Sequence, residues 1–206
     1  QVLAWTPLMA LGTLILFIGV GTEGAIKGMV VFLLVHALYK AALFMVAGVI
    51  DHGTGTRDLG TLSGLGRAMP VTFVVALLAG ASMAGLPPLF GFIGKEYLYK
   101  GALDGPLMPW VVICAFAASA LMFAAAFVVA WRPFRGPAMD REVHEGGTAL
   151  LAGPAVLAVL GLAFGALPHL SRPLLEPAAS AVLGAPAKVE LHLWTGINTA
   201  LILSLL

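Results

Sequence analysis

The chain has 206 residues, of which 60% are hydrophobic and 10% are charged, with a mean hydropathy of +1.01. Soluble domains carry about 25% charged residues, so this composition excludes a water-soluble fold. It indicates an all-α, polytopic membrane protein, because helices satisfy their own backbone hydrogen bonds in lipid. The net charge of +1, without a basic cluster, gives no sign of a nucleic-acid partner. The lone Cys114 excludes a disulfide framework and a thiol metal site.

The first two predicted spans cover residues 2–20 and 25–50, joined by a short turn. Glycines in the first span favour close packing against a neighbouring helix. The sequence starts at Gln1 and stops inside an apolar run, so we expect it to be a fragment of a longer protein.

The second span carries His36 and Lys40 inside an apolar run. A charge at the centre of a bilayer costs about 3 kcal/mol on insertion scales, so such residues usually face a bundle interior or a wet path. The i, i+4 spacing puts both side chains on one helix face, and both can exchange protons. The sequence therefore predicts a proton relay. The alternative is a lysine that reaches along the helix to the membrane interface.

A polar connection follows at residues 51–69. Asp51, His52 and Thr54 could begin a metal-binding loop. The favoured interpretation is a solvated turn in which Asp and Thr side chains cap backbone groups.

The third span begins near Pro70, a suitable first-turn residue, and is predicted to break within the membrane. Proline removes a backbone donor and clashes with the preceding turn, so two prolines in a row must interrupt the helix. The residues of the break are Gly85, Pro87, Pro88 and Gly91. The helix is expected to resume near Phe92, which places Lys95 about one turn later. Broken helices at membrane depth occur where they line a cavity or are buried in protein, so Lys95 is a second candidate on an ion path.

The rest of the chain is predicted to be scaffold. Helices are expected over residues 108–131 and 149–167, a surface segment over 168–188, and a final helix from Val189. Glu96 is expected near the interface with Lys100 and Asp104, and Trp194 is expected to be an interface anchor. Arginines gather in the connections 51–69 and 132–147, which predicts that both face the cytoplasm.

The sequence contains no nucleotide loop, flavin or nicotinamide fingerprint, metal quartet or nucleophile elbow. No cofactor is therefore expected. The residues favour ion movement over covalent catalysis.

Two motifs carry a family resemblance: His36-Ala-Leu-Tyr-Lys40, and the run from Gly85-Leu86-Pro87-Pro88 to Lys95-Glu96. They resemble the antiporter-like subunit family, which includes the large proton-pumping subunits of respiratory complex I and subunits of Mrp-type sodium/proton antiporters. Residues 51–58 and 82–92 are most similar to the Mrp A subunits.

The resemblance implies an inverted-repeat fold, with residues 1–132 in the second repeat and 133–206 in the helices that follow. It implies a multi-pass subunit of the cell (inner) membrane that exchanges Na⁺ for H⁺ beside other membrane subunits, and is not an enzyme. His36, Lys40 and Lys95 would carry the ion path. The alternative is a proton-translocating subunit of complex I or of a membrane-bound hydrogenase.

The chain departs from the family pattern in two places. Phe32 stands where some relatives carry a second histidine, and residues 5–9 read Trp-Thr-Pro-Leu-Met where relatives carry polar Ser and Gln. The second departure leaves a polar connection between the first two helices without support from the sequence.

Overall fold

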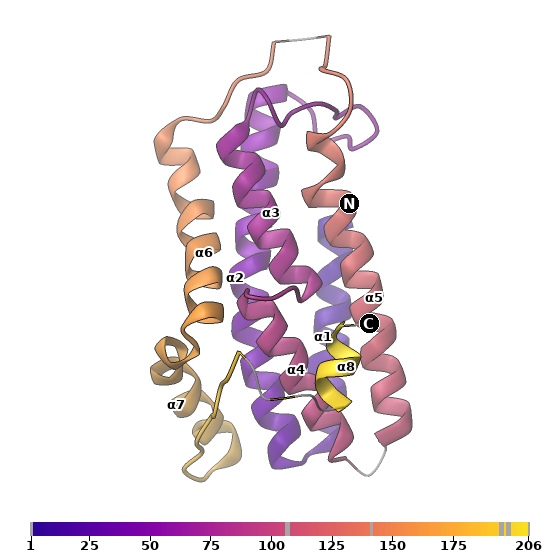
Figure 1. Cartoon of the computed structure of the whole chain (residues 1–206), viewed down its shortest axis with the longest axis vertical. Coiled ribbons are helices and arrows are strands. Elements are labelled where there is room, and N and C mark those ends of the chain that lie inside the picture. The colour runs from indigo at the N-terminus through magenta and orange to yellow at the C-terminus, as the bar shows by residue number, and fades with distance from the viewer. Residues whose placement is uncertain (1, 106–107, 141, 194–195, 197–198, 206) are drawn as a thin grey trace.

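The computed structural model describes residues 2–105, 108–140, 142–193, 196 and 199–205, and this part of the chain contains helices and no strand (Figure 1). The α-helices are α1 (Val2–Val20), α2 (Glu23–Thr54), α3 (Pro70–Ala84), α4 (Phe90–Leu103), α5 (Met108–Ala130), α6 (Thr148–Ala166), α7 (Arg172–Leu183) and α8 (Thr199–Leu205), with short 3₁₀ turns η1 (Arg132–Phe134) and η2 (Pro168–Ser171). Four described segments are long and apolar enough to cross a membrane: α1, α2, α5 continued through η1, and α6.

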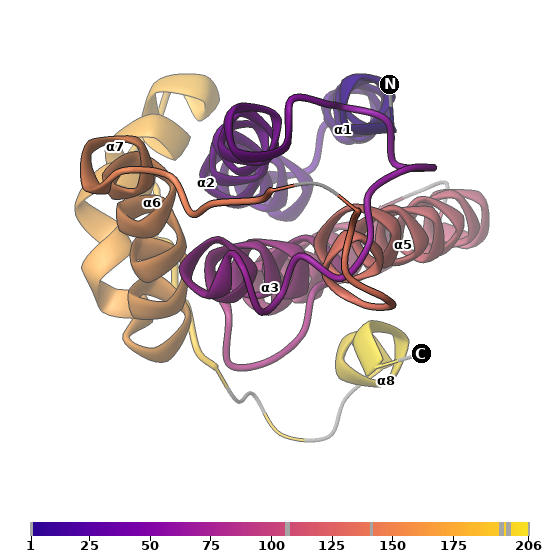
Figure 2. The same cartoon turned by 90° about the horizontal axis from the view of Figure 1, so that it is seen from above.

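Helix α2 is the longest of the described helices and packs against α1, α3, α4, α6 and α7 (Figures 1 and 2). It begins where the Thr22 hydroxyl accepts a hydrogen bond from the Ala25 amide, and it ends at Gly55, whose φ is 69°. Its 32 residues extend about 48 Å at 1.5 Å per residue. The bilayer core is about 30 Å thick. The helix is therefore long enough to cross that core with residues to spare, and Lys40 lies near the midpoint of the helix.

The interruption between α3 and α4 begins at a glycine. Gly85 has a φ of 75° and its amide donates to the Ser82 carbonyl at 3.0 Å. The Leu86 amide donates to the Ala81 carbonyl, also at 3.0 Å. This pair of bonds is the Schellman arrangement, which satisfies carbonyls left over at a helix end. The predicted break is confirmed, and its first cause is Gly85 rather than the prolines.

The prolines and a serine start the next helix. Pro87 and Pro88 have no amide hydrogen and cannot extend α3. Helix α4 begins at Phe90, two residues earlier than predicted, and the Ser82 hydroxyl accepts the Gly91 amide at 3.2 Å. A methyl group at Gly91 would lie 1.7 Å from the Ser82 carbonyl oxygen, so only glycine permits this approach of the two helices.

The two polar connections lie at one end of the bundle, as predicted. The Gly64 amide donates to the Arg135 carbonyl at 2.9 Å, and the Ser63 hydroxyl donates to the Pro137 carbonyl at 2.9 Å. That this end faces the cytoplasm stays a prediction, and Arg141 lies outside the described residues.

Asp51 and Arg57, at the start of the first polar connection, form an ion pair at 2.7 Å. The hydrogen bond from the Arg57 Nε to Asp51 raises the pKa of the guanidinium. Asp58 caps the turn that follows, where its carboxylate accepts the Gly60 amide at 2.9 Å. These contacts agree with the solvated turn that the sequence favoured.

The prediction of a last helix starting at Val189 is wrong, because the described residues 186–192 form no helix and α8 begins at Thr199. Contacts from distant side chains use the backbone groups that a helix would need. The Val189 amide donates to Glu176 at 3.3 Å, and the Glu190 carbonyl accepts the Tyr97 hydroxyl. Trp194 lies outside the described residues.

The outer faces of the bundle are apolar. Trp5 on α1 is 67% exposed, Trp110 on α5 is 71% exposed, and Val156 on α6 is 57% exposed. Such side chains suit contact with lipid or with neighbouring membrane subunits. The division of the chain at residue 132 stays a prediction.

Candidate functional site

Lys40 lies inside the bundle and is only 6% exposed. Its ammonium donates a hydrogen bond to the Thr6 hydroxyl on α1 and lies 5.3 Å from the centre of the Phe44 ring. The side chain therefore points across to a neighbouring helix and does not run along α2 to its end. This contradicts the alternative in which Lys40 reaches the membrane interface. Its role as a proton carrier stays a prediction.

The partner of Lys40 depends on a proline in α1. Pro7 has no amide hydrogen, so the Leu3 carbonyl one turn earlier lacks its helical donor. The Thr6 hydroxyl donates to that carbonyl at 3.1 Å and leaves its oxygen free to accept from Lys40. The polar connection between α1 and α2, unsupported by the sequence, is present in the structure.

His36 has a different partner from Lys40. Its Nδ1 lies 2.8 Å from the Tyr39 hydroxyl, and the two rings meet edge to face with centroids 5.2 Å apart. His36 and Lys40 lie one helical turn apart, as predicted. Their described hydrogen bonds go to other side chains, His36 to Tyr39 and Lys40 to Thr6, and not to each other.

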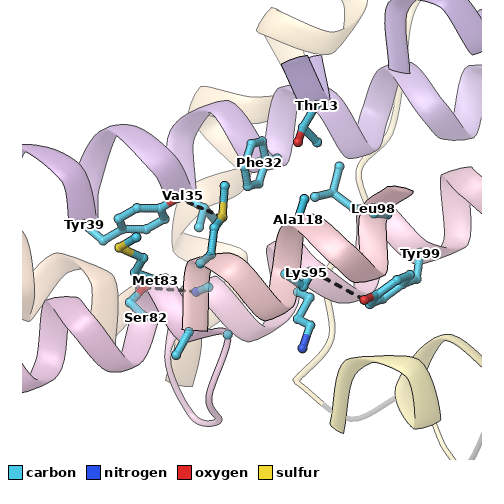
Figure 3. Close-up of a pocket in the computed structure, with 16 residues that line it drawn as sticks. Thr13, Phe32, Val35, Tyr39, Ser82, Met83, Lys95, Leu98, Tyr99 and Ala118 are labelled. Atoms are coloured by element: carbon cyan, nitrogen blue, oxygen red, sulfur yellow. Dashed lines mark hydrogen bonds between the residues drawn. The ribbon is translucent and has the colours of Figure 1, made fainter. Parts of the chain in front are cut away.

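A cavity of about 30 Å³ lies between the break and the surrounding helices (Figure 3). This volume has room for at least one water molecule. Helices α1 to α5 contribute its lining: Thr13, Phe32, Val35, Tyr39, Ser82, Met83, Ala84, Gly85, Gly91, Lys95, Leu98, Tyr99, Ala115, Ala118, Ser119 and Met122. The cavity thus joins the predicted break to the helix that carries His36.

Lys95 lies one and a half turns after the start of α4 and is half-buried. Its stem lines the cavity, whereas its ammonium turns toward α8 and donates to the Ser204 carbonyl at 2.8 Å (Figure 3). The predicted position of Lys95 beside the break is confirmed. Pro87 and Pro88 lie next to the cavity but do not line it.

Glu96 is buried within the protein and pairs with Lys100, and its expected place at the membrane interface stays a prediction. Glu96 is 1% exposed, and its carboxylate lies 3.1 Å from the Lys100 ammonium. A buried carboxylate needs such partners because its desolvation is costly. The i, i+4 spacing of Glu96 and Lys100 was the available sequence signal for this pair.

Sequence reasoning also missed Tyr39 and Thr6. Tyr39 follows His36 by three residues, a spacing that brings side chains together on a helix and was readable in the motif. Thr6 gave no comparable signal, because its contact with Lys40 joins residues far apart in the sequence.

A larger cavity of about 380 Å³ lies between α1, α2 and the connection after α2. Its walls are mostly apolar, with Thr56 and Arg57 as the polar side chains. Lys95 lines the smaller cavity and not this one, so we place the candidate site at the smaller cavity.

These features define a polytopic helical membrane protein with ionisable side chains inside the bundle and one discontinuous helix. The chain belongs to the family described as NADH:quinone oxidoreductase/Mrp antiporter, TM, which matches residues 1–124. This confirms the resemblance found in the motifs.

Two curated relatives are the A subunits of Na⁺/H⁺ antiporters. The chain is 34% identical to that of Alkalihalophilus pseudofirmus, with 99% of this chain and 30% of the relative covered. It is 31% identical to that of Bacillus subtilis, with 99% and 29% covered. The chain therefore spans less than a third of the length of these relatives.

Two solved structures have the same fold. A chain of the Mrp complex from Dietzia sp. is 35% identical with a TM-score of 0.83, covering 98% of this chain and 22% of that one. A chain of respiratory complex I from Thermus thermophilus is 29% identical with a TM-score of 0.71, covering 87% and 38%. The predicted antiporter-like fold is confirmed.

Proposed function

We propose that this chain is part of the A subunit of a multisubunit monovalent cation/proton antiporter of the cell membrane, with Na⁺ as the cation. The observation that carries the proposal is the placement of two lysines, one buried at the middle of α2 and one half-buried beside a broken helix. The names of the curated relatives and the closer fit to the Mrp complex support the same function.

In this proposal His36, Lys40 and Lys95 pass protons along the membrane interior. Lys40 and Lys95 repel each other when both are charged, and the low dielectric of the bundle strengthens that repulsion. Uptake of a proton at one lysine then favours release at the other. The chain acts as part of a transporter and performs no redox chemistry of its own.

The partners in this proposal are other membrane subunits, the lipid bilayer, and the transported Na⁺ and H⁺. The exposed apolar side chains of α1, α5 and α6 provide surfaces for lipid and for those subunits. The second candidate is a proton-translocating subunit of a redox enzyme, which the similarity to the complex I chain favours.

The test uses the complete complex in inside-out vesicles, with proton movement followed by a pH-sensitive dye after addition of Na⁺. Lys40→Arg keeps the positive charge, but arginine cannot release a proton at working pH, so we expect assembly with most transport lost. Lys95→Ala is expected to abolish Na⁺-dependent proton movement.

Lys27→Arg is the matched control, because Lys27 lies on α2, as Lys40 does, and pairs with Glu23 at the first residue of that helix. It is expected to transport at the parental rate. Parental transport by Lys40→Arg and Lys95→Ala would refute the proposed path. Transport that needs an electron donor and ignores Na⁺ would favour the redox candidate instead.

A further inference from the structure

We propose that the Tyr39 hydroxyl carries protons between His36 and the cavity beside Lys95. This inference rests on the proposed function and adds a residue to the path. It assigns to Tyr39 the connection from His36 on α2 to Lys95 on α4, which the spacing of residues along α2 does not supply.

The position of the Tyr39 hydroxyl carries the argument. Tyr39 is 3% exposed, and its oxygen lies 2.8 Å from the Nδ1 of His36. The other contact of this hydroxyl is the Met122 sulfur at 3.9 Å, and a thioether is a weak acceptor. Of these two contacts the strong one is the hydrogen bond to the histidine. Water can replace the weak contact with Met122 and accept a proton from the hydroxyl.

The second observation is the shared cavity. Tyr39 and Lys95 come from different helices and line the same space of about 30 Å³ (Figure 3). The Ser82 hydroxyl also lines it and already holds the Gly91 amide at the start of α4. A water molecule in this space would lie between the tyrosine and the stem of the lysine.

The proton transfer balances without any other reactant. A charged His36 gives the proton on Nδ1 to the Tyr39 oxygen, while the hydroxyl gives its own proton to water in the cavity. Tyr39 is a neutral phenol before and after this step, and His36 becomes neutral with its remaining proton on Nε2. The water then passes its extra proton to a neutral Lys95.

Lys95 must turn for this last transfer, because its ammonium is bonded to the Ser204 carbonyl on α8. Lysine has a flexible four-carbon stem, and the stem of Lys95 already lies against the cavity. A neutral amine turned into the cavity accepts the proton, and the charged ammonium returns to the carbonyl.

The test is Tyr39→Phe in the complete complex, assayed for Na⁺-dependent proton movement in vesicles. This change removes one oxygen atom and keeps the ring that packs in the bundle. Because a positioned proton-transfer group typically contributes about a hundredfold or more, and water in the cavity can replace part of that, we expect the rate to fall about tenfold. Assembly is expected to remain parental.

Tyr97→Phe is the matched control. Tyr97 lies on α4, donates to the Glu190 carbonyl, and does not line the cavity. It is expected to keep the parental rate. An equal fall in both variants would show that loss of any hydrogen-bonded tyrosine hydroxyl, not loss of a proton carrier, is responsible, and would overturn the proposal.

A double variant separates a shared path from independent effects. If His36 and Tyr39 act in series, His36→Ala with Tyr39→Phe is expected to be no slower than the slower single variant. Multiplied effects would overturn the proposal. If Tyr39→Phe keeps the parental rate while Lys95→Ala is inactive, only the role of Tyr39 is refuted. If both variants keep the parental rate, the proposed function is refuted as well.

Discussion

Gly85→Ala is expected to disturb transport through Lys95 as well as through backbone strain. Gly85 ends α3 with a φ of 75°, in the left-handed region. A methyl group there would lie 2.8 Å from the Cδ of Lys95. Alanine at this position therefore strains the backbone and pushes the lysine.

The two effects have separate magnitudes. The left-handed conformation costs alanine about 1–2 kcal/mol. Carbon atoms in contact are normally about 3.5–4.0 Å apart, so the Lys95 stem must move by about 1 Å. The bond from its ammonium to the Ser204 carbonyl is 2.8 Å long. A shift of that size along the bond would stretch it past the usual limit of about 3.2 Å.

Gly184→Ala is the matched control for strain alone. Gly184 ends α7 with a φ of 68°, and nothing lies within 4 Å of the methyl group that alanine would add. Thermal unfolding of the complex and proton movement in vesicles are measured for both variants. We expect similar losses of stability, and a severalfold loss of transport per assembled complex for Gly85→Ala only.

Two results would refute this reasoning. Parental transport by Gly85→Ala would mean that the position of the Lys95 stem does not matter. An equal loss of transport in Gly184→Ala would mean that stability, not the contact with Lys95, limits the rate.

Three further predictions concern the rest of the site. Thr6→Val should destabilise the complex by about 1–3 kcal/mol, because the buried Lys40 ammonium loses its acceptor; Thr6→Ser should restore the parental melting temperature. Changing both residues of Pro87-Pro88 to alanine should leave the break in place, because α3 already ends before them, and a continuous helix in a solved structure of that variant would contradict this. Ser63→Cys in a Cys114-free background should resist an impermeant thiol reagent on intact cells, and strong labelling would reverse the assigned orientation.

The features that the sequence predicted well depend on local signals. The length of an apolar run sets a span, and the predicted bounds of α1 and the start of α3 agree with the structure. Glycine and proline mark the break, because the wide range of φ of glycine and the fixed φ of proline act at their own positions. The interior position of Lys40 followed from its distance to the ends of the run.

The features that it missed depend on contacts between distant residues. The acceptor of Lys40 is Thr6, on another helix. The non-helical segment after α7 is held by Glu176 and by Tyr97, and neither lies next to it in the sequence. A local pattern cannot report such contacts, because they depend on which distant side chains the fold brings to the segment.

Both lysines lie beside an interruption of helical hydrogen bonding, and this explains how an apolar bundle can hold them. Pro7 leaves a carbonyl in α1 that orients the Thr6 hydroxyl, and that hydroxyl accepts Lys40. Gly85 ends α3 and opens the cavity that the stem of Lys95 lines. In a membrane interior without bulk water, polar partners must come from the protein itself, and here they come from Thr6 on α1 and from the Ser204 carbonyl on α8. Pro7→Ala should therefore weaken the hold on Lys40 without touching it, because the Leu3 carbonyl regains an amide donor and no longer orients Thr6. A solved structure of this variant should show the Lys40 ammonium away from the Thr6 hydroxyl, and an unchanged contact would contradict this role of Pro7.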